Sequence, residues 1–152
     1  MGAAAGTLTF MIGAKSKEQF ESLKPLLSCM GINFFNCGKS GAGQMAKLCN
    51  NMALGIEMAG VCQALNLGKS FGIDVSALAN IMKVSTSRCW SIDTNTPVPG
   101  VLPGSPASND YEGGYRTALT VKDLTLAIES AQKLGVKVNL AHDSRYFYEK
   151  IV

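Results

Sequence analysis

The sequence predicts a mainly helical fold built around one long helix, with a short β segment at the start of the chain. The long helix spans residues 44–70, where proline is absent and good helix formers dominate. Its apolar residues fall on nearly every side, a pattern typical of burial all round. Further segments with helical periodicity follow it, and two strand-like runs precede it.

The β segment consists of two short runs separated by a helix. Residues 7–12 (TLTFMI) and 32–37 (INFFNC) have strand composition. Between them, residues 16–19 fit a capping box that begins an amphipathic helix. Pro25 should kink this helix or confine it to the residues before it. Two short strands without a larger sheet would leave unpaired edges.

Three shorter helices are expected after the long one. The first starts at Asp74 or Val75 and ends near residues 85–87, and the second spans 118–134 with Gly135 as its stop. The third, residues 140–151, is amphipathic, and its Tyr146, Phe147 and Ile151 are expected to pack.

A proline- and glycine-rich loop occupies residues 94–115. Such composition by itself predicts a surface connection with local turns. Its length exceeds that of most structureless connections, so we expect an ordered functional or interface loop.

Composition limits the classes of function. The chain has 152 residues, enough for one domain, and a formal net charge of +3 with scattered basic residues, which argues against a nucleic-acid surface. Glu57, Gln63 and Asn66 dilute the apolar run of the long helix, so no membrane span is expected. The N-terminal residues show no targeting segment.

The five cysteines form no CxxC pair, which favours a reducing compartment. Cys49 and Cys62 fall in the long helix and are expected to be buried as apolar fillers. The single histidine, His142, is far in sequence from any cysteine, so we expect no metal site. We expect His142 at the surface or at a helix end.

Two polar residues near the start of the long helix require an explanation. Lys47 and Asn51 are four residues apart and therefore share one face of the helix. A lysine partly desolvated near the positive end of a helix dipole should have a pKa below the usual value of about 10.4, which suits general acid/base work. The alternative is a lysine that extends to solvent from a helix end, with asparagine as a local hydrogen bonder.

The spacing Gly38-x-x-Gly41-x-Gly43-x-x-x-Lys47-x-x-x-Asn51 resembles the catalytic motif of the β-hydroxyacid dehydrogenases. The resemblance implies that Lys47 is the proton donor and acceptor at the substrate oxygen and that Asn51 orients the substrate. A strand, a glycine turn and a helix also begin dinucleotide-binding units, but this spacing is not GxGxxG. We expect these glycines to permit a tight turn and close backbone approach.

Two further stretches carry the resemblance. Residues 87–91 (SRCWS) with 97–101 (PVPGV) resemble the 3-hydroxyisobutyrate dehydrogenase branch of the family. Trp90 and Tyr115 could line a substrate pocket, although large aromatic residues are more often core or interface anchors.

Lys122 and Asp123 form a KD pair on the 118–134 helix, which by itself is typical of a solvated face. The resemblance implies that Lys122 lies against the nicotinamide end of a bound cofactor. It makes Asp123 a weaker candidate, for positioning Lys122 or another basic group.

The resemblance also implies a domain arrangement. Residues 1–38 correspond to the end of a Rossmann-type NAD-binding domain, and residues 39–152 to a helical substrate and dimerisation domain like that of 6-phosphogluconate dehydrogenase. The dinucleotide fingerprint is not found in the sequence. We therefore expect a C-terminal fragment or truncated form that is inactive by itself.

The implied activity is NAD-dependent oxidation of 3-hydroxyisobutyrate, a small hydroxy acid, to methylmalonate semialdehyde in valine catabolism. The implied assembly is a homodimer or higher homo-oligomer. Its implied location is the mitochondrial matrix in a eukaryote, or otherwise the cytoplasm. Two alternatives stay open: reduction of another small semialdehyde or hydroxy acid, such as tartronate semialdehyde or glyoxylate, and a helical oligomerisation module without turnover.

Overall fold

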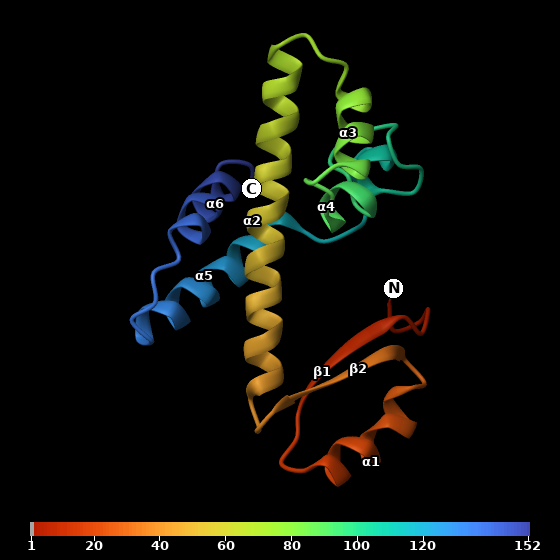
Figure 1. The fold of residues 1–152 in the computed structure, drawn as a ribbon, viewed down its shortest axis with the longest axis vertical. Coiled ribbons are helices and arrows are strands. Elements are labelled where there is room, and N and C mark those ends of the chain that lie inside the picture. Colours follow the sequence, from red (N-terminus) through yellow and green to blue (C-terminus); the bar gives the residue numbers. More distant parts are fainter. Residues whose placement is uncertain (1) are drawn as a thin grey trace. The chain divides into compact units, whose positions relative to one another are not determined.

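The computed structural model describes residues 2–152 and is mainly helical, with one two-stranded sheet (Figure 1). The chain divides into two compact units, residues up to 50 and residues 51–152, which are described separately below. The expected mainly helical class with a short β segment is confirmed.

The first unit contains a parallel β-α-β arrangement. Strand β1 (Leu8–Gly13) pairs in parallel with β2 (Gly31–Gly38), and α1 (Lys17–Leu27) connects them. Phe10 and Phe34 are register partners whose rings stack with centroids 5.7 Å apart. The two predicted strands are therefore confirmed: β1 is shifted by one residue toward Gly13, and β2 extends by one glycine at each end.

The glycine turn after β2 has two separate physical reasons for its composition. Gly41 has φ +89°, a left-handed conformation that side chains rarely adopt. Gly43 is buried, and a Cβ there would collide with the backbone carbonyl of Met11. The expected roles of tight turning and close approach are both confirmed.

Helix α1 differs from expectation at Pro25. Ser16 caps the helix as predicted by accepting a hydrogen bond from the Gln19 N–H at 3.2 Å. The helix then runs through Pro25 to Leu27, so confinement to earlier residues is wrong. Pro25 lies in the last turn and removes one N–H donor, and the helix still closes after it through the bond from the Ser28 N–H to the Lys24 carbonyl at 2.8 Å.

The long helix α2 (Ala42–Ser70) supplies residues to two hydrophobic clusters in the second unit. Helices α5 (Thr117–Lys133) and α6 (Asn139–Glu149) lie on one side of α2, and α3 (Val75–Val84) and α4 (Trp90–Asp93) on the other (Figure 1). The first cluster comprises Ala59, Leu124, Ile128, Ala141 and Tyr148. The second comprises Val61, Leu65, Ala79, Met82 and Ile92.

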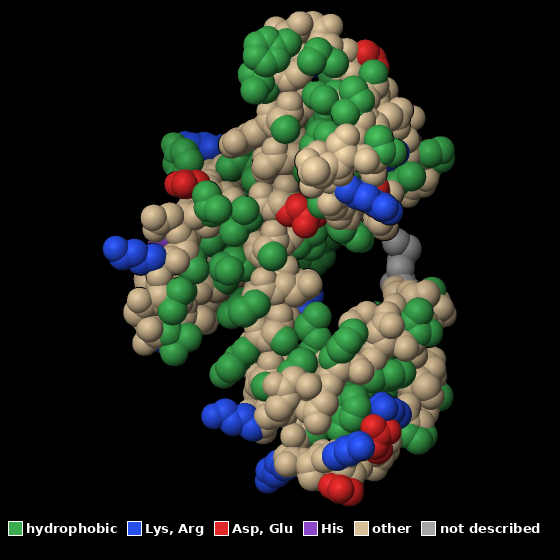
Figure 2. Space-filling model, in the orientation of Figure 1, with side chains coloured by type: hydrophobic (Ala, Val, Ile, Leu, Met, Phe, Trp, Pro, Cys, Tyr) green, Lys and Arg blue, Asp and Glu red, His purple; other side chains and the backbone are tan. Residues whose placement is uncertain are grey.

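Burial of α2 on all sides is wrong for this chain. Leu67 is 56% exposed, and Cys49 is exposed rather than a buried filler. Cys62 is partly buried, and burial raises the pKa of its thiol. The neighbouring helices cover only part of α2, and Figure 2 shows hydrophobic side chains at the surface of the helical part.

Helix α6 packs through residues other than those predicted. Tyr146 is 62% exposed and Ile151 also lies outside the core, whereas Tyr148 is buried; only Phe147 contacts the first cluster as expected. The buried residues Ala141, Ser144 and Tyr148 follow a helical repeat of three and four. The Tyr148 hydroxyl donates to the Gly55 carbonyl of α2 at 2.7 Å.

The 94–115 loop is ordered, as predicted. It contains the 3₁₀ helix η1 (Pro106–Asn109) and buries Thr96, Ser105 and Ala107. The Ser105 hydroxyl donates to the Leu102 carbonyl at 2.9 Å, so this buried hydroxyl finds its acceptor within the loop. In residues 2–152, no helix is both long and apolar enough to cross a bilayer.

Replacing Tyr148 with Phe should lower the free energy of unfolding by about 1 kcal/mol, the usual net value of one hydrogen bond. The ring and its packing stay, and only the bond to Gly55 is lost. Urea denaturation measures the change. Tyr146→Phe is the matched control because its ring is largely exposed, and an equal effect of both variants would contradict this role of Tyr148.

Candidate active site

The candidate site in the second unit is organised by Asp123, in the second turn of α5. Asp123 is only 8% exposed. Tyr115 lies just before the helix, after a turn in which Gly113 and Gly114 have φ values of +83° and +68°. Asn51 reaches the same carboxylate from α2, 72 residues away in sequence.

Three donors converge on the Asp123 carboxylate. Oδ2 accepts hydrogen bonds from Asn51 Nδ2 and from the Tyr115 hydroxyl, each at 2.6 Å. Oδ1 pairs with Lys122 Nζ at 2.8 Å. We call these four residues the Asp123 network.

The charge state of the network follows from these contacts. Burial acts to raise the pKa of Asp123, but the hydrogen bonds from Lys122, Tyr115 and Asn51 outweigh it and hold the pKa below its ordinary value. Burial, followed by the Asp123 charge, raises the pKa of Tyr115 to about 12. At neutral pH, the network therefore contains an ionised carboxylate and a protonated phenol.

The structure brings three of the four predicted site residues together: Asn51, Lys122 and Asp123. Lys47 lies four residues before Asn51 on α2, in the first unit, with an exposed side chain. The sequence pattern by itself predicted a solvated face for both Lys122 and Asp123. This is wrong for Asp123, which is buried. It holds for the Lys122 side chain, which is 56% exposed.

The aromatic residues behave differently from each other. Trp90 is 47% exposed, so it is not a core anchor within this chain. Tyr115 is 54% exposed, yet its hydroxyl is fixed by Asp123. Sequence reasoning named Tyr115 but had no signal for this hydrogen bond, because it considered Asp123 only as part of a solvated face or as a partner of basic groups.

Sequence reasoning missed the role of Glu57, which it used only as evidence against a membrane span. The Glu57 Oε1 atom accepts hydrogen bonds from the Ser91 N–H at 3.0 Å and from the Ser91 hydroxyl at 2.9 Å. Ser91 is fully buried at the start of α4. A lone carboxylate in an apolar helix was the available signal, because such a group requires donors.

Glu57 also affects Cys89, the residue before α4. Burial, followed by the contact with Glu57, raises the pKa of the Cys89 thiol. A thiol of this kind stays protonated and is a poor nucleophile.

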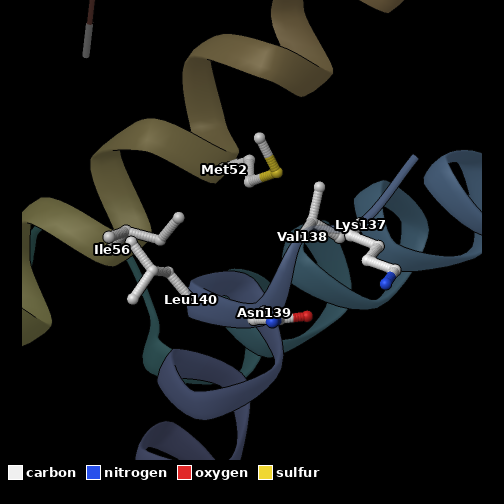
Figure 3. Close-up of a pocket in the computed structure, with 6 residues that line it drawn as sticks. All are labelled: Met52, Ile56, Lys137, Val138, Asn139 and Leu140. Atoms are coloured by element: carbon white, nitrogen blue, oxygen red, sulfur yellow. The ribbon is translucent and has the colours of Figure 1, made fainter.

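An open apolar pocket lies elsewhere in the second unit (Figure 3). Met52 and Ile56 of α2 form one wall, and residues 137–140 form the other. None of the predicted site residues lines it. Residues 2–152 contain no group of three or more side chains suited to hold a metal ion, and His142 is exposed as expected.

Comparison with known proteins identifies the family. Residues 41–151 match the family model described as "NAD-binding of NADP-dependent 3-hydroxyisobutyrate dehydrogenase". This match runs from the glycine turn to α6 and places the chain in the class of nicotinamide-dinucleotide dehydrogenases. The chain belongs to the 3-hydroxyisobutyrate dehydrogenase family, as the sequence motifs indicated.

Individual relatives agree with this assignment. The chain is 46% identical over 151 residues to "Probable 3-hydroxyisobutyrate dehydrogenase, mitochondrial" of Dictyostelium discoideum, covering 99% of this chain and 47% of that protein. It is 48% identical over 149 residues to the mitochondrial enzyme of Rattus norvegicus, covering 97% and 44%. The chain thus spans a little under half the length of these relatives.

A solved structure shares the fold. The 3-hydroxyisobutyrate dehydrogenase of Mycobacterium tuberculosis, determined with L-serine, superposes with a TM-score of 0.91 at 38% sequence identity. The alignment covers 99% of this chain and 51% of that protein.

Replacing Glu57 with Ala should destabilise the fold by about 2 kcal/mol, because two donors of the buried Ser91 lose a charged acceptor. Glu57→Gln should cost less, since its amide oxygen can still accept both bonds. Thermal unfolding measures the change. Glu129→Ala, on the exposed face of α5, is the control, and equal melting temperatures for the two alanine variants would refute the role of Glu57.

Proposed function

We propose that this chain supplies the helical part of an NAD-dependent 3-hydroxyisobutyrate dehydrogenase. The observation that carries the proposal is the hydrogen bond between Asn51 and Asp123, because it joins the two separate motifs that the family resemblance assigns to substrate and cofactor. Residues 39–152 would form the substrate and dimerisation domain. Residues 1–38 would correspond to the end of the NAD-binding domain.

Lys47 is the proposed general acid/base. In the oxidation direction, its amine takes the proton of the substrate hydroxyl while the carbon–oxygen double bond forms and a hydride leaves the carbinol carbon. In the reverse direction, the ammonium returns that proton to the aldehyde oxygen. Asn51, one helical turn further along α2, would orient the substrate oxygen.

Lys122 is the proposed contact to the cofactor. An ammonium group has three N–H donors, and the pair with Asp123 uses one of them. Because the Lys122 side chain is half-exposed, its remaining donors fit a carbonyl or anionic group at the nicotinamide end. When bound, the nicotinamide ring supplies the acceptor for the hydride.

A second candidate function is reduction of another small semialdehyde or hydroxy acid, such as tartronate semialdehyde or glyoxylate. The SRCWS and PVPGV segments favour the 3-hydroxyisobutyrate branch. The eukaryotic relatives are named as mitochondrial, which supports a matrix location if the source is a eukaryote. For any other source, the proposed location is the cytoplasm. The 152-residue chain by itself is proposed to lack turnover.

Lys47→Ala in the enzyme that contains this chain should lower the turnover number for 3-hydroxyisobutyrate by roughly 100-fold or more, the usual contribution of a positioned acid/base. Dinucleotide affinity should change little, because the assigned cofactor contact is Lys122. Absorbance of the reduced nicotinamide measures the rate, with NAD and NADP compared because the family description names NADP.

Lys69→Ala is the matched control, since it removes an exposed lysine from the last turn of the same helix. Full activity of Lys47→Ala would contradict the acid/base role and favour the alternative, a lysine that extends to solvent from a helix end. Turnover of glyoxylate or tartronate semialdehyde without turnover of 3-hydroxyisobutyrate would favour the second candidate.

The protein should sediment as a homodimer or higher oligomer. Exposed apolar side chains on and just after α2, such as Leu67 and Phe71, provide area that a second copy could bury. Analytical ultracentrifugation measures the mass. A monomer across the micromolar range would contradict this proposal.

A further inference from the structure

We infer that Asp123 and Tyr115 are positioning residues that fix the orientation of the Asn51 carboxamide toward the substrate. This inference rests on the proposed function, in which Asn51 orients the substrate oxygen. It adds Tyr115 to that site and gives Asp123 a defined task there. Neither residue is required to touch the substrate.

The first step is the geometry around Asp123. Its Oδ2 atom accepts from Asn51 and from Tyr115, both at 2.6 Å, so one oxygen atom joins α2 to the loop before α5. The other oxygen is held by Lys122 at 2.8 Å. With both oxygens engaged, the carboxylate has little freedom to rotate, and the Asn51 amide is tied to a fixed partner.

The second step is the polarity of the amide. An ionised carboxylate accepts hydrogen bonds and donates none. Asn51 must therefore present its NH₂ group to Asp123, since the reversed amide would place an oxygen against an oxygen. The carbonyl oxygen of the same planar group then points away from Asp123, and its two lone pairs let it accept a substrate hydroxyl beside any other partner.

The third step is the contribution of Tyr115. Its ring is about half exposed, so it adds little to the core, but its hydroxyl makes one of the two short bonds to Oδ2. Removing that hydroxyl leaves Oδ2 with one of its two hydrogen bonds, the one from Asn51. The Asn51 amide would then sample more than one orientation.

The kinetic test is a double-mutant cycle. Tyr115→Phe should lower the turnover number about tenfold, within the range of coupling seen in hydrogen-bond networks. In an Asn51→Ala background, the same change should alter it less than twofold, because Tyr115 acts through Asn51. Tyr111→Phe is the control: it removes a tyrosine hydroxyl bonded to the Pro97 carbonyl at 3.2 Å in the same loop, and it should change neither rate.

Two kinetic results would overturn the inference. Equal losses from Tyr115→Phe in both backgrounds would show that the hydroxyl acts independently of Asn51. No loss in the wild-type background would show that the hydroxyl is irrelevant. If the wild-type enzyme does not oxidise 3-hydroxyisobutyrate, the proposed function fails, and the measurement described next decides the inference.

The second readout needs no turnover. NMR with carboxyl-labelled aspartate follows the titration of Asp123, assigned with the Asp123→Asn variant. The groups that face this carboxylate are Lys122 of α5, Tyr115 of the loop and the neutral Asn51 of α2. Because the Tyr115 hydroxyl favours the charged form, Tyr115→Phe should raise the pKa of Asp123.

The direction of the pH effect follows. A carboxylate with a depressed pKa holds its donors at neutral pH and loses them as the pH falls through that pKa. Tyr115→Phe should therefore move this loss to a higher pH, whereas Tyr111→Phe should not. An unchanged pKa of Asp123 in Tyr115→Phe would overturn the inference whatever the substrate proves to be.

Discussion

The close approach of α5 to α2 at Gly55 is the constraint on which the second unit depends. A Cβ on Gly55 would lie 3.2 Å from a methyl group of Leu124, so the absence of a side chain sets how near the helices come. Asn51 is one turn before Gly55, and Asp123 is the residue before Leu124. The apolar contact therefore brings the two polar side chains within hydrogen-bond distance.

Polar bonds from α2 fix its neighbours more specifically than apolar packing does. The Gly55 carbonyl accepts from the Tyr148 hydroxyl of α6, and the Glu57 carboxylate accepts from the buried Ser91 of α4. Apolar contacts alone would allow helices to slide, whereas each of these bonds has one partner and one distance. Helix α2 is thus a scaffold whose few polar groups determine the position of its neighbours.

Sequence reasoning predicted the elements well because their signals are local. The limits of α2 follow from a glycine turn and an uninterrupted run of helix formers. Helix α3 starts at Val75, one of the two predicted starts, and the Asp74 side chain caps it by accepting from the Ala77 N–H. Packing was harder to predict. The prediction that Tyr146 packs was wrong, and Tyr148 is the buried tyrosine. Both residues suit a helix, and only the way α6 lies against α2 decides which of them is buried.

In the candidate site too, local signals were predicted and contacts between distant segments were not. Lys47, Asn51 and Lys122 could be named from motif spacing, but the meaning of Asp123 depends on three donors from different parts of the chain. The sequence alone does not distinguish an aspartate on an exposed helix face from one that is buried among donors. Only the buried one is held in place and depends on its donors to stay charged. Burial without partners would neutralise this group, so its ionisation is a property of the assembled fold. That property gives Asn51 a defined polarity, and it arises only once α2, α5 and the preceding loop are together.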